Sequence, residues 1–353
     1  MCFRAQPFPS VGTIQYLVAR PRHNVSTYTD LAGMAKAVAD TRSPAENAAG
    51  YVTDENQIIG FSHMHDSGTG GNPSLGNFPL YVHPGCPFDD FTKCDYAITH
   101  RGADRVPGSV LASPGYFSIN LTNSVRAEMT VTEHAVLYRF SFPGTDTVNV
   151  TADDVTKEVP YSPLIVADMI DLSNSRHKGG CQVYPESGRI VGDGQYSPSF
   201  GSGFYQAFFC ADFRGAKIRN TGTFLSNDAA EEPKYSTFGR GFSSPSGSSG
   251  AWIQFERPEN DSILARVGVS FISVDQACEN AESEIPGFAF QKVEEDAQQV
   301  WRNKLSGVQV DSSGVSEELQ TTFWSGLYRT LLSPQNYTGE NPLWNSTEPY
   351  FDS

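Results

Sequence analysis

Apolar and polar side chains alternate along many short segments of this chain, and this alternation restricts the fold more than any other feature. A period of two residues places every second side chain on one face, as in a strand with one buried face. The alternating apolar residues are Phe117, Ile119 and Leu121; Val125, Ala127, Met129 and Val131; Tyr138, Phe140 and Phe142; and Ala265, Val267, Val269 and Phe271. Turn-forming residues occur at 113–115, 142–144 and 192–194, and the polar residues 243–250 are expected to form an exposed hairpin loop. The pattern predicts a β-sandwich, which we assign to residues 31–275.

A helical period replaces the alternation in residues 276–353, which we assign to linker helices and the start of a truncated second domain. The apolar stripes are Val293, Ala297, Val300, Trp301 and Leu305, and then Leu319, Phe323, Leu327, Tyr328 and Leu331. Ser316 is placed to cap the second helix, and Glu317 and Glu318 lie near its positive end. The aromatic residues are expected to pack in a core. The fold is therefore predicted to be mainly β, with helices after the sandwich.

The charge balance argues against two kinds of partner. The 353 residues include 25 Lys and Arg against 40 Asp and Glu, which gives a formal net charge of −15. We expect no nucleic acid partner, because the sequence has no basic stripe to neutralise phosphates. We also expect no membrane partner, because an acidic chain is not attracted to anionic lipid and no apolar run is long enough to span a bilayer.

Glycosylation sequons favour the secretory pathway. Six Asn-x-Ser/Thr sites without an intervening proline begin at Asn24, Asn120, Asn149, Asn260, Asn336 and Asn345. Asn120 falls in a predicted strand and is expected to be unmodified. Residues 1–30 form an atypical segment that is no signal peptide, since arginines interrupt it and it has no apolar stretch. We therefore expect a secreted protein whose N-terminus is incomplete here.

The six cysteines allow disulfides without fixing them. Cys86 and Cys94 flank a short loop and could close it. Cys2, Cys181, Cys210 and Cys278 are far apart in the sequence, so their pairing stays open and buried free thiols are equally compatible with it.

Residues 60–80, which read GFSHMHDSGTGGNPSLGNFPL, are the best candidate for a binding loop. On a strand, His63 and His65 would point to the same face. Asp66 would then begin a turn, and Gly70 and Gly71 would let the backbone approach a ligand closely. The alternative is that the histidines only hold the loop. We assign no metal, because a zinc site needs a third ligand that the spacing does not supply, and the glycines match no phosphate-binding motif.

Four segments together resemble glycoside hydrolase family 92 in a fungal form. They are residues 60–80, residues 112–117 (ASPGYF), residues 128–140 (EMTVTEHAVLYRF) and residues 323–341 (FWSGLYRTLLSPQNYTGEN). The similarity runs from about residue 33 to residue 353. Near the N-terminus only Gly33-Met34 and the residues up to Thr41 resemble the family, so the first strand of the sandwich is expected to be missing.

The resemblance implies a calcium-dependent, inverting exo-α-mannosidase that acts on mannose-containing glycans. It implies a sandwich and linker helices that pack on an (α/α)6 barrel, with the active site between them. The carboxylate pair, the calcium ligands and a Trp-Asp-x-x-Arg clamp belong mainly to that barrel, which is expected to be absent from this chain. We therefore assign no catalytic residue and no metal ligand, and we expect the chain to be inactive alone. His63, His65, Asp66, Gly70 and Gly71 are predicted to line the sugar pocket.

The adjacent pairs Asp89-Asp90, Asp153-Asp154 and Glu294-Glu295 are interpreted as solvated loop or helix-surface residues, because neighbours in sequence do not make an acid–base pair. A stand-alone carbohydrate-binding sandwich without catalysis is the alternative function. A purely structural or interaction domain is the third possibility.

Overall fold

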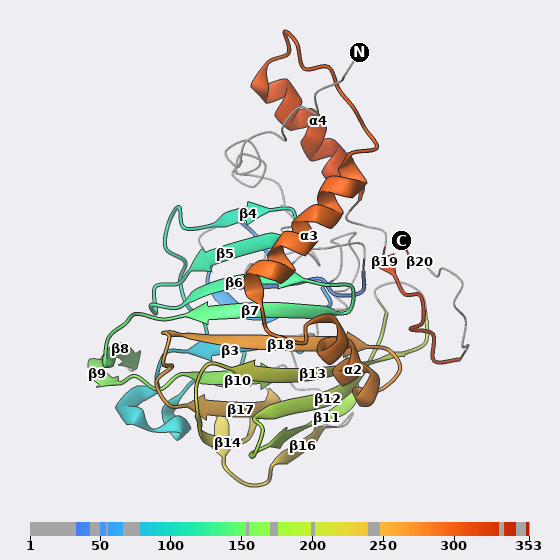
Figure 1. Cartoon of the computed structure of the whole chain (residues 1–353). Coiled ribbons are helices and arrows are strands. Elements are labelled where there is room, and N and C mark those ends of the chain that lie inside the picture. Colours follow the sequence, from blue (N-terminus) through green and yellow to red (C-terminus); the bar gives the residue numbers. More distant parts are fainter. Residues whose placement is uncertain are drawn as a thin grey trace.

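The computed structural model describes residues 33–42, 50–53, 56–65, 78–152, 155–169, 176–198, 202–238, 248–331, 335–343 and 351–352. Within these residues two large antiparallel sheets stack on each other, and helices follow them (Figure 1). The prediction of a mainly β fold with helices after the sheets is confirmed.

One sheet has seven strands and the other has nine. The seven-stranded sheet contains, in spatial order, β1 (Val38–Thr41), β2 (Ile58–Ser62), β3 (Leu80–His83), β10 (Leu164–Asp168), β17 (Ser249–Phe255), β14 (Ile218–Leu225) and β15 (Asp228–Ala230). The nine-stranded sheet contains β16 (Tyr235–Phe238), β11 (Arg176–Tyr184), β12 (Arg189–Tyr196), β13 (Tyr205–Arg214), β18 (Ser262–Ser270), β7 (Ala135–Ser141), β6 (Arg126–Val131), β5 (Tyr116–Asn120) and β4 (Leu111–Ser113).

The smaller elements lie outside these two sheets. They are a ribbon of β8 (Thr147–Ala152) and β9 (Val155–Pro160), the pair β19 (Gln335–Asn336) and β20 (Phe351–Asp352), the short 3-10 helices η1 (Pro87–Asp89) and η2 (Phe91–Lys93), and the helices α2 (Val274–Glu284), α3 (Phe290–Leu305) and α4 (Glu317–Thr330).

Aromatic side chains from both sheets form the main core. Phe61 of β2 contacts Phe140 of β7 with ring centroids 5.5 Å apart, and Phe255 of β17 contacts Phe213 of β13 at 5.8 Å. The apolar positions expected on β5, β6, β7 and β18 are buried, so the alternation identified these strands correctly. Burial of each such side chain contributes about 1.5–3 kcal/mol, and the sandwich is held mainly by this layer.

Two glycine-rich segments were wrongly predicted to be turns or loops. Gly192 and Gly194 lie inside β12. A Cβ on Gly192 would stand 2.6 Å from the ring of Phe209 and 2.7 Å from the carbonyl oxygen of Gly180, so the neighbouring strands pack closely at this residue. Ser249 and Gly250 are buried at the start of β17, and a Cβ on Gly250 would meet the carbonyl oxygen of Ala167 at 2.0 Å. In both places glycine serves close strand packing rather than a turn. Residues 243–247 lie outside the described residues.

Helices α2 and α3 cover the outer face of the nine-stranded sheet (Figure 1). Phe290 and Val293 of α3 pack with Ala135 and Leu137 of β7. At Gly115, where φ is +86°, a Cβ would stand 3.0 Å from Ala297, so this turn approaches α3 closely. Helix α4 begins at the predicted cap, since the Ser316 side chain accepts a hydrogen bond from the Leu319 amide.

Two disulfides tie loops and helices to the sheets. Cys86 and Cys94 are bonded, as the sequence suggested, and they close the loop that carries η1 and η2. Cys210 of β13 and Cys278 of α2 form a second bond that the sequence left open. Cys181 is a buried free thiol, and its burial raises its pKa to about 12. The linker helix α2 is therefore fixed covalently to the sheet beneath it.

Candidate functional site at the linker end of the sandwich

We call the end of the sheets at which β18 leads into α2 the linker end. The histidines of the predicted binding loop and a buried polar network lie there. The β6–β7 turn at residues 132–134 lies there, because the Val269 amide donates to the His134 carbonyl oxygen. The amides of Met34 and Ala35 donate to the Glu133 carbonyl oxygen at 2.8 and 3.0 Å. The Lys36 amide donates to the His63 carbonyl oxygen, so the predicted binding loop begins at this same end.

His63 follows β2 and is fully buried. Its Nδ1 lies 2.7 Å from the Tyr138 hydroxyl and its Nε2 lies 2.6 Å from the Phe78 carbonyl oxygen. Burial lowers the pKa of His63 to about 4, so the ring is neutral near pH 7 and its Nε2 proton is donated to Phe78. Since both ring nitrogens are engaged inside the protein, this geometry corresponds to the alternative in which His63 holds the loop.

His65 is also buried and pairs with Asp40, with 3.2 Å between His65 Nε2 and Asp40 Oδ1. The Ser62 hydroxyl donates to the same carboxylate oxygen at 2.9 Å. Gly50 packs against this pair with φ at +76°, and a Cβ there would stand 2.5 Å from His65 Nε2. Only glycine fits this position, both for its backbone conformation and for its contact with the ring.

The other predicted pocket residues, Asp66, Gly70 and Gly71, lie outside the described residues. The structure therefore brings His63 and His65 to the linker end and gives no geometry for the glycine loop that follows them. That Asp66, Gly70 and Gly71 line a sugar pocket stays a prediction.

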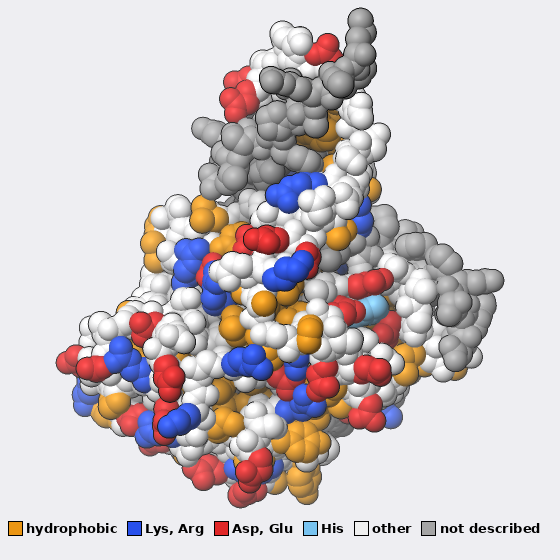
Figure 2. Space-filling view, in the orientation of Figure 1, with side chains coloured by type: hydrophobic (Ala, Val, Ile, Leu, Met, Phe, Trp, Pro, Cys, Tyr) orange, Lys and Arg blue, Asp and Glu red, His pale blue; other side chains and the backbone are white. Residues whose placement is uncertain are grey.

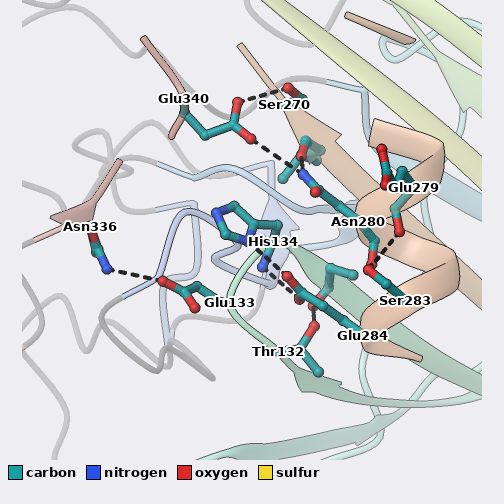
Figure 3. A network of polar contacts seen from close by, with 12 residues as sticks. Thr132, Glu133, His134, Ser270, Glu279, Asn280, Ser283, Glu284, Asn336 and Glu340 are labelled. Atoms are coloured by element: carbon teal, nitrogen blue, oxygen red, sulfur yellow. Dashed lines mark hydrogen bonds and ion pairs between the residues drawn. The ribbon is translucent and has the colours of Figure 1, made fainter. Parts of the chain in front are cut away.

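A polar network that the sequence did not reveal surrounds the β6–β7 turn (Figure 3). His134 and Glu284 point toward each other, with 2.7 Å between His134 Nδ1 and Glu284 Oε1, and the His134 amide donates to Glu284 Oε2 at 2.9 Å. Burial alone would lower the pKa of His134, but the hydrogen bond and charge of Glu284 outweigh it and raise that pKa. Burial would raise the pKa of Glu284, yet hydrogen bonds from His134 and Thr132 lower it.

The same network holds the segment after α4 against the sandwich. Glu340 is buried and accepts hydrogen bonds from the Ser270 hydroxyl at 2.7 Å and the Phe271 amide at 2.6 Å. Asn280 of α2 donates to the other oxygen of Glu340 at 3.3 Å. Asn336 Nδ2 donates to Glu133 Oε1 at 2.9 Å. Strands, linker helix and post-linker segment are thus joined at one place.

A second cluster orients α3 on the nine-stranded sheet. Arg139 donates to both oxygens of Glu128 at 2.7 Å, and the Tyr116 hydroxyl donates to Glu128 Oε1 at 2.7 Å. Burial alone would raise the pKa of Glu128, but Arg139 and Tyr116 lower it to about 2. The Arg139 guanidinium also lies 4.3 Å from the ring centroid of Phe290 at the start of α3. Two of the family-like segments, 112–117 and 128–140, therefore meet to seat the linker.

The described residues do not form a metal site. No group of three His, Cys, Asp or Glu side chains in this part of the chain is arranged to hold an ion. Three carboxylates at the linker end, Asp40, Glu133 and Glu340, already receive hydrogen bonds or an ion pair from protein groups. Calcium, which needs six to eight oxygen ligands, does not fit the described residues.

No helix in the described part of the chain is long and apolar enough to cross a bilayer.

Two solved structures share this fold. The GH92 family glycosyl hydrolase ccman5 matches with a TM-score of 0.73 and 20% identity, over 93% of this chain and 42% of that one. A family GH92 inverting mannosidase from Bacteroides thetaiotaomicron matches with a TM-score of 0.69 and 20% identity, over 93% of this chain and 40% of that one. At this identity the likeness concerns the fold alone.

A curated relative and two family models extend the comparison to the sequence. An uncharacterized secreted glycosidase from Arthroderma benhamiae is 47% identical over 325 residues, which are 91% of this chain and 41% of the relative. The chain thus spans about two fifths of the length of that relative. The model of the glycosyl hydrolase family 92 N-terminal domain matches residues 9–270, and the model of the family 92 catalytic domain matches residues 276–353. The resemblance seen in the sequence is confirmed, and this chain belongs to glycosyl hydrolase family 92.

Proposed function

We propose that the protein to which this chain belongs is a secreted exo-α-mannosidase that releases terminal mannose from glycans with inversion of configuration. The order of the two family models along the chain supports a glycosidase. The proposed substrate and stereochemistry follow from membership of a family in which a member of known structure is an inverting mannosidase. The name of the Arthroderma relative, a secreted glycosidase, supports the location.

Inverting hydrolysis requires two carboxyl groups about 6.5–9.5 Å apart, one to protonate the leaving oxygen and one to activate water. The adjacent acids that the structure describes are not arranged as such a pair. Asp89 forms an ion pair with Arg219, Asp90 accepts a hydrogen bond from the Thr92 amide, and Glu294 and Glu295 lie on α3. Asp153 and Asp154 lie outside the described residues. We therefore place the acid–base pair and the calcium ligands in the remainder of the catalytic domain, so that this chain alone is inactive.

The proposed contribution of this chain is to shape one wall of the sugar pocket. In this proposal Asp66, Gly70 and Gly71 contact mannose hydroxyls, while His63 and His65 hold the loop through Tyr138 and Asp40. A helical barrel would pack against the linker end and α4, whose Leu319 and Phe323 are 61% and 44% exposed. The convergence of the loop, the linker and the post-linker segment at one end is the observation that carries this assignment.

The test uses the full-length gene product and a dimannoside with an α-linkage. Mannose release with β-mannose as the first product by NMR, loss of activity with a calcium chelator and recovery on adding calcium are expected. Binding of the dimannoside in calorimetry without any hydrolysis would overturn the proposal in favour of the stand-alone binding sandwich.

The pocket wall is tested separately by Gly70→Val in the same full-length enzyme. We expect turnover to fall by about tenfold or more, because a side chain at this position displaces the substrate from the reacting groups. Gly287→Val is the matched control, since a Cβ on Gly287 meets nothing within 4 Å. Equal kinetics in the two variants would remove Gly70 from the pocket.

A further inference from the structure

Four of the six glycosylation sequons begin at residues that the structure describes, and these four differ sharply in their surroundings. They begin at Asn120, Asn149, Asn260 and Asn336. An N-linked glycan needs an amide nitrogen that faces solvent in the folded protein and that makes no contact the fold depends on. Two of the four meet this condition.

Asn149 lies on the outward face of the β8–β9 ribbon. Its neighbours Val148 and Val159 form the inward face and are buried near Gly85, whereas Asn149 and its cross-strand partner Glu158 are exposed. Thr151, the hydroxyl residue of the sequon, lies on the same outward face because side chains alternate along a strand. Asn149 makes no side-chain hydrogen bond within the described part of the chain.

Asn260 lies in the turn between β17 and β18 and is exposed. This turn packs against the segment that leads into β8, since Arg257 forms ion pairs with Asp146 and Asp261 and the Phe142 amide donates to the Asp261 carbonyl oxygen. Asn260 itself has no side-chain hydrogen bond to any described residue. The two exposed sequons therefore lie at the same end of the sheets.

The other two asparagines are engaged by the fold. Asn336 donates to Glu133, and its Oδ1 accepts hydrogen bonds from the amide and the hydroxyl of Thr338, the third residue of its own sequon. Asn120 is half-buried between β4 and β6, with its Oδ1 3.5 Å from Arg126 Nη1. A glycan on either residue would intrude on the linker end or on the sheet.

We propose that Asn149 and Asn260 carry N-linked glycans and that Asn120 and Asn336 do not. The modification transfers a glycosyl group from a diphosphate-activated donor. The Asn Nδ2 forms a bond to the anomeric carbon, the bond from that carbon to the donor oxygen breaks, the diphosphate leaves with the electron pair, and one Nδ2 proton goes to a base. Modification at these positions rests on the proposed secretion of the protein.

The location of both sites makes the glycans compatible with the rest of the protein. Strand β18 begins beside Asn260 and ends at α2, and its nine residues span roughly 25 Å. The ribbon and α2 lie at opposite sides of the molecule in Figure 1. In Figure 2 the ribbon side carries charged side chains of both signs. Glycans there would lie away from the linker end and leave it open.

The experiment expresses the full-length protein behind a heterologous secretion leader in a eukaryotic host. Peptide mapping after enzymatic deglycosylation, which converts each occupied asparagine to aspartate, then reads every site. We expect occupancy at Asn149 and Asn260 only, among the four. An unmodified Asn149 or Asn260, or a glycan on Asn120 or Asn336 in the folded product, would overturn the proposal. Natural secretion is judged separately, from the culture medium of the native organism, so its failure is distinguishable.

A matched pair of variants separates the sequon from the ribbon that carries it. Thr151 and Thr156 share a hydrogen bond of 2.8 Å between their hydroxyls. Thr151→Val removes this bond and the sequon, and Thr156→Val removes this bond alone. We expect the glycan at Asn149 to be lost in the first variant and kept in the second. Loss in both, or retention in both, would contradict the assignment.

Discussion

His134 and Glu284 join the sandwich to its linker helix through two hydrogen bonds, 2.7 Å at the ring and 2.9 Å at the backbone amide. They are 150 residues apart in the sequence, and one lies in the β6–β7 turn while the other ends α2. Their side chains are only 15% and 22% exposed, so solvent screens the pair weakly. The contact ties the C-terminal end of α2 to the β6–β7 turn.

The stabilising effect of this pair should depend on pH. The folded-state pKa of His134 is raised, so its contribution is complete below about pH 6.5 and is lost as the pH rises through the folded value. The pKa of Glu284 is lowered, so its contribution is present above about pH 4.5 and is lost on acidification. The pair is therefore strongest between these values.

His134→Gln should lower the free energy of unfolding, measured with urea, by about 1–2 kcal/mol near pH 5.5 and by less near pH 8.5. His100→Gln, at an exposed position, is the control, and a pH-independent cost would contradict this account.

Gly268 of β18 allows α2 to approach the sheet. A Cβ there would stand 2.0 Å from the Ala277 carbonyl oxygen, which belongs to the helix backbone and cannot move alone. Gly268→Ala should destabilise the protein by about 1–3 kcal/mol because the whole helix must shift. Gly326→Ala in α4, where a Cβ meets nothing, should stabilise by about 0.5–1 kcal/mol through helix propensity. Chemical unfolding of both variants checks this, and the same sign of effect in the two would refute the packing argument.

The Cys210–Cys278 bond should matter more for stability than the Cys86–Cys94 bond. It closes a loop with a sequence separation of 68 residues, against 8 for the other. The chain-entropy model gives roughly 4 kcal/mol for the long loop and roughly 2.5 kcal/mol for the short one. Replacing each pair by serine and comparing the unfolding free energies measures the difference. A larger loss from the Cys86–Cys94 pair would show that the entropic argument does not govern this fold.

Local patterns in the sequence predicted much of the fold. The alternation along β5, β6, β7 and β18 and the apolar stripe along α3 both reflect burial of one face. Such a pattern can be recognised within a short segment of sequence. The cap at Ser316 is equally local. Helix α2 was missed because it packs on the sheet through the small residues Ala277 and Ala281 and so has only a weak apolar stripe.

The linker end was less predictable because its contacts are distant in sequence. Glu133 meets Asn336, and Glu340 meets Ser270, across 203 and 70 residues. No periodic pattern in the sequence indicates side-chain contacts between residues so far apart. The only local sign was that Glu133, Asn336 and Glu340 fall in the family-like segments 128–140 and 323–341, and Ser270 lies in neither. The buried glycines of β12 and β17 were read as turns for a related reason, since close packing from another strand leaves no mark on the neighbouring residues.

The most direct measurement is the mannose released from an α-linked dimannoside by the purified 353-residue chain, once cooperative unfolding has shown that it is folded. Our account predicts no release above the buffer blank, because bond cleavage is assigned to residues outside this chain. Release of mannose at a rate abolished by changing one of the chain's own acids, for example Glu340→Gln, would contradict it.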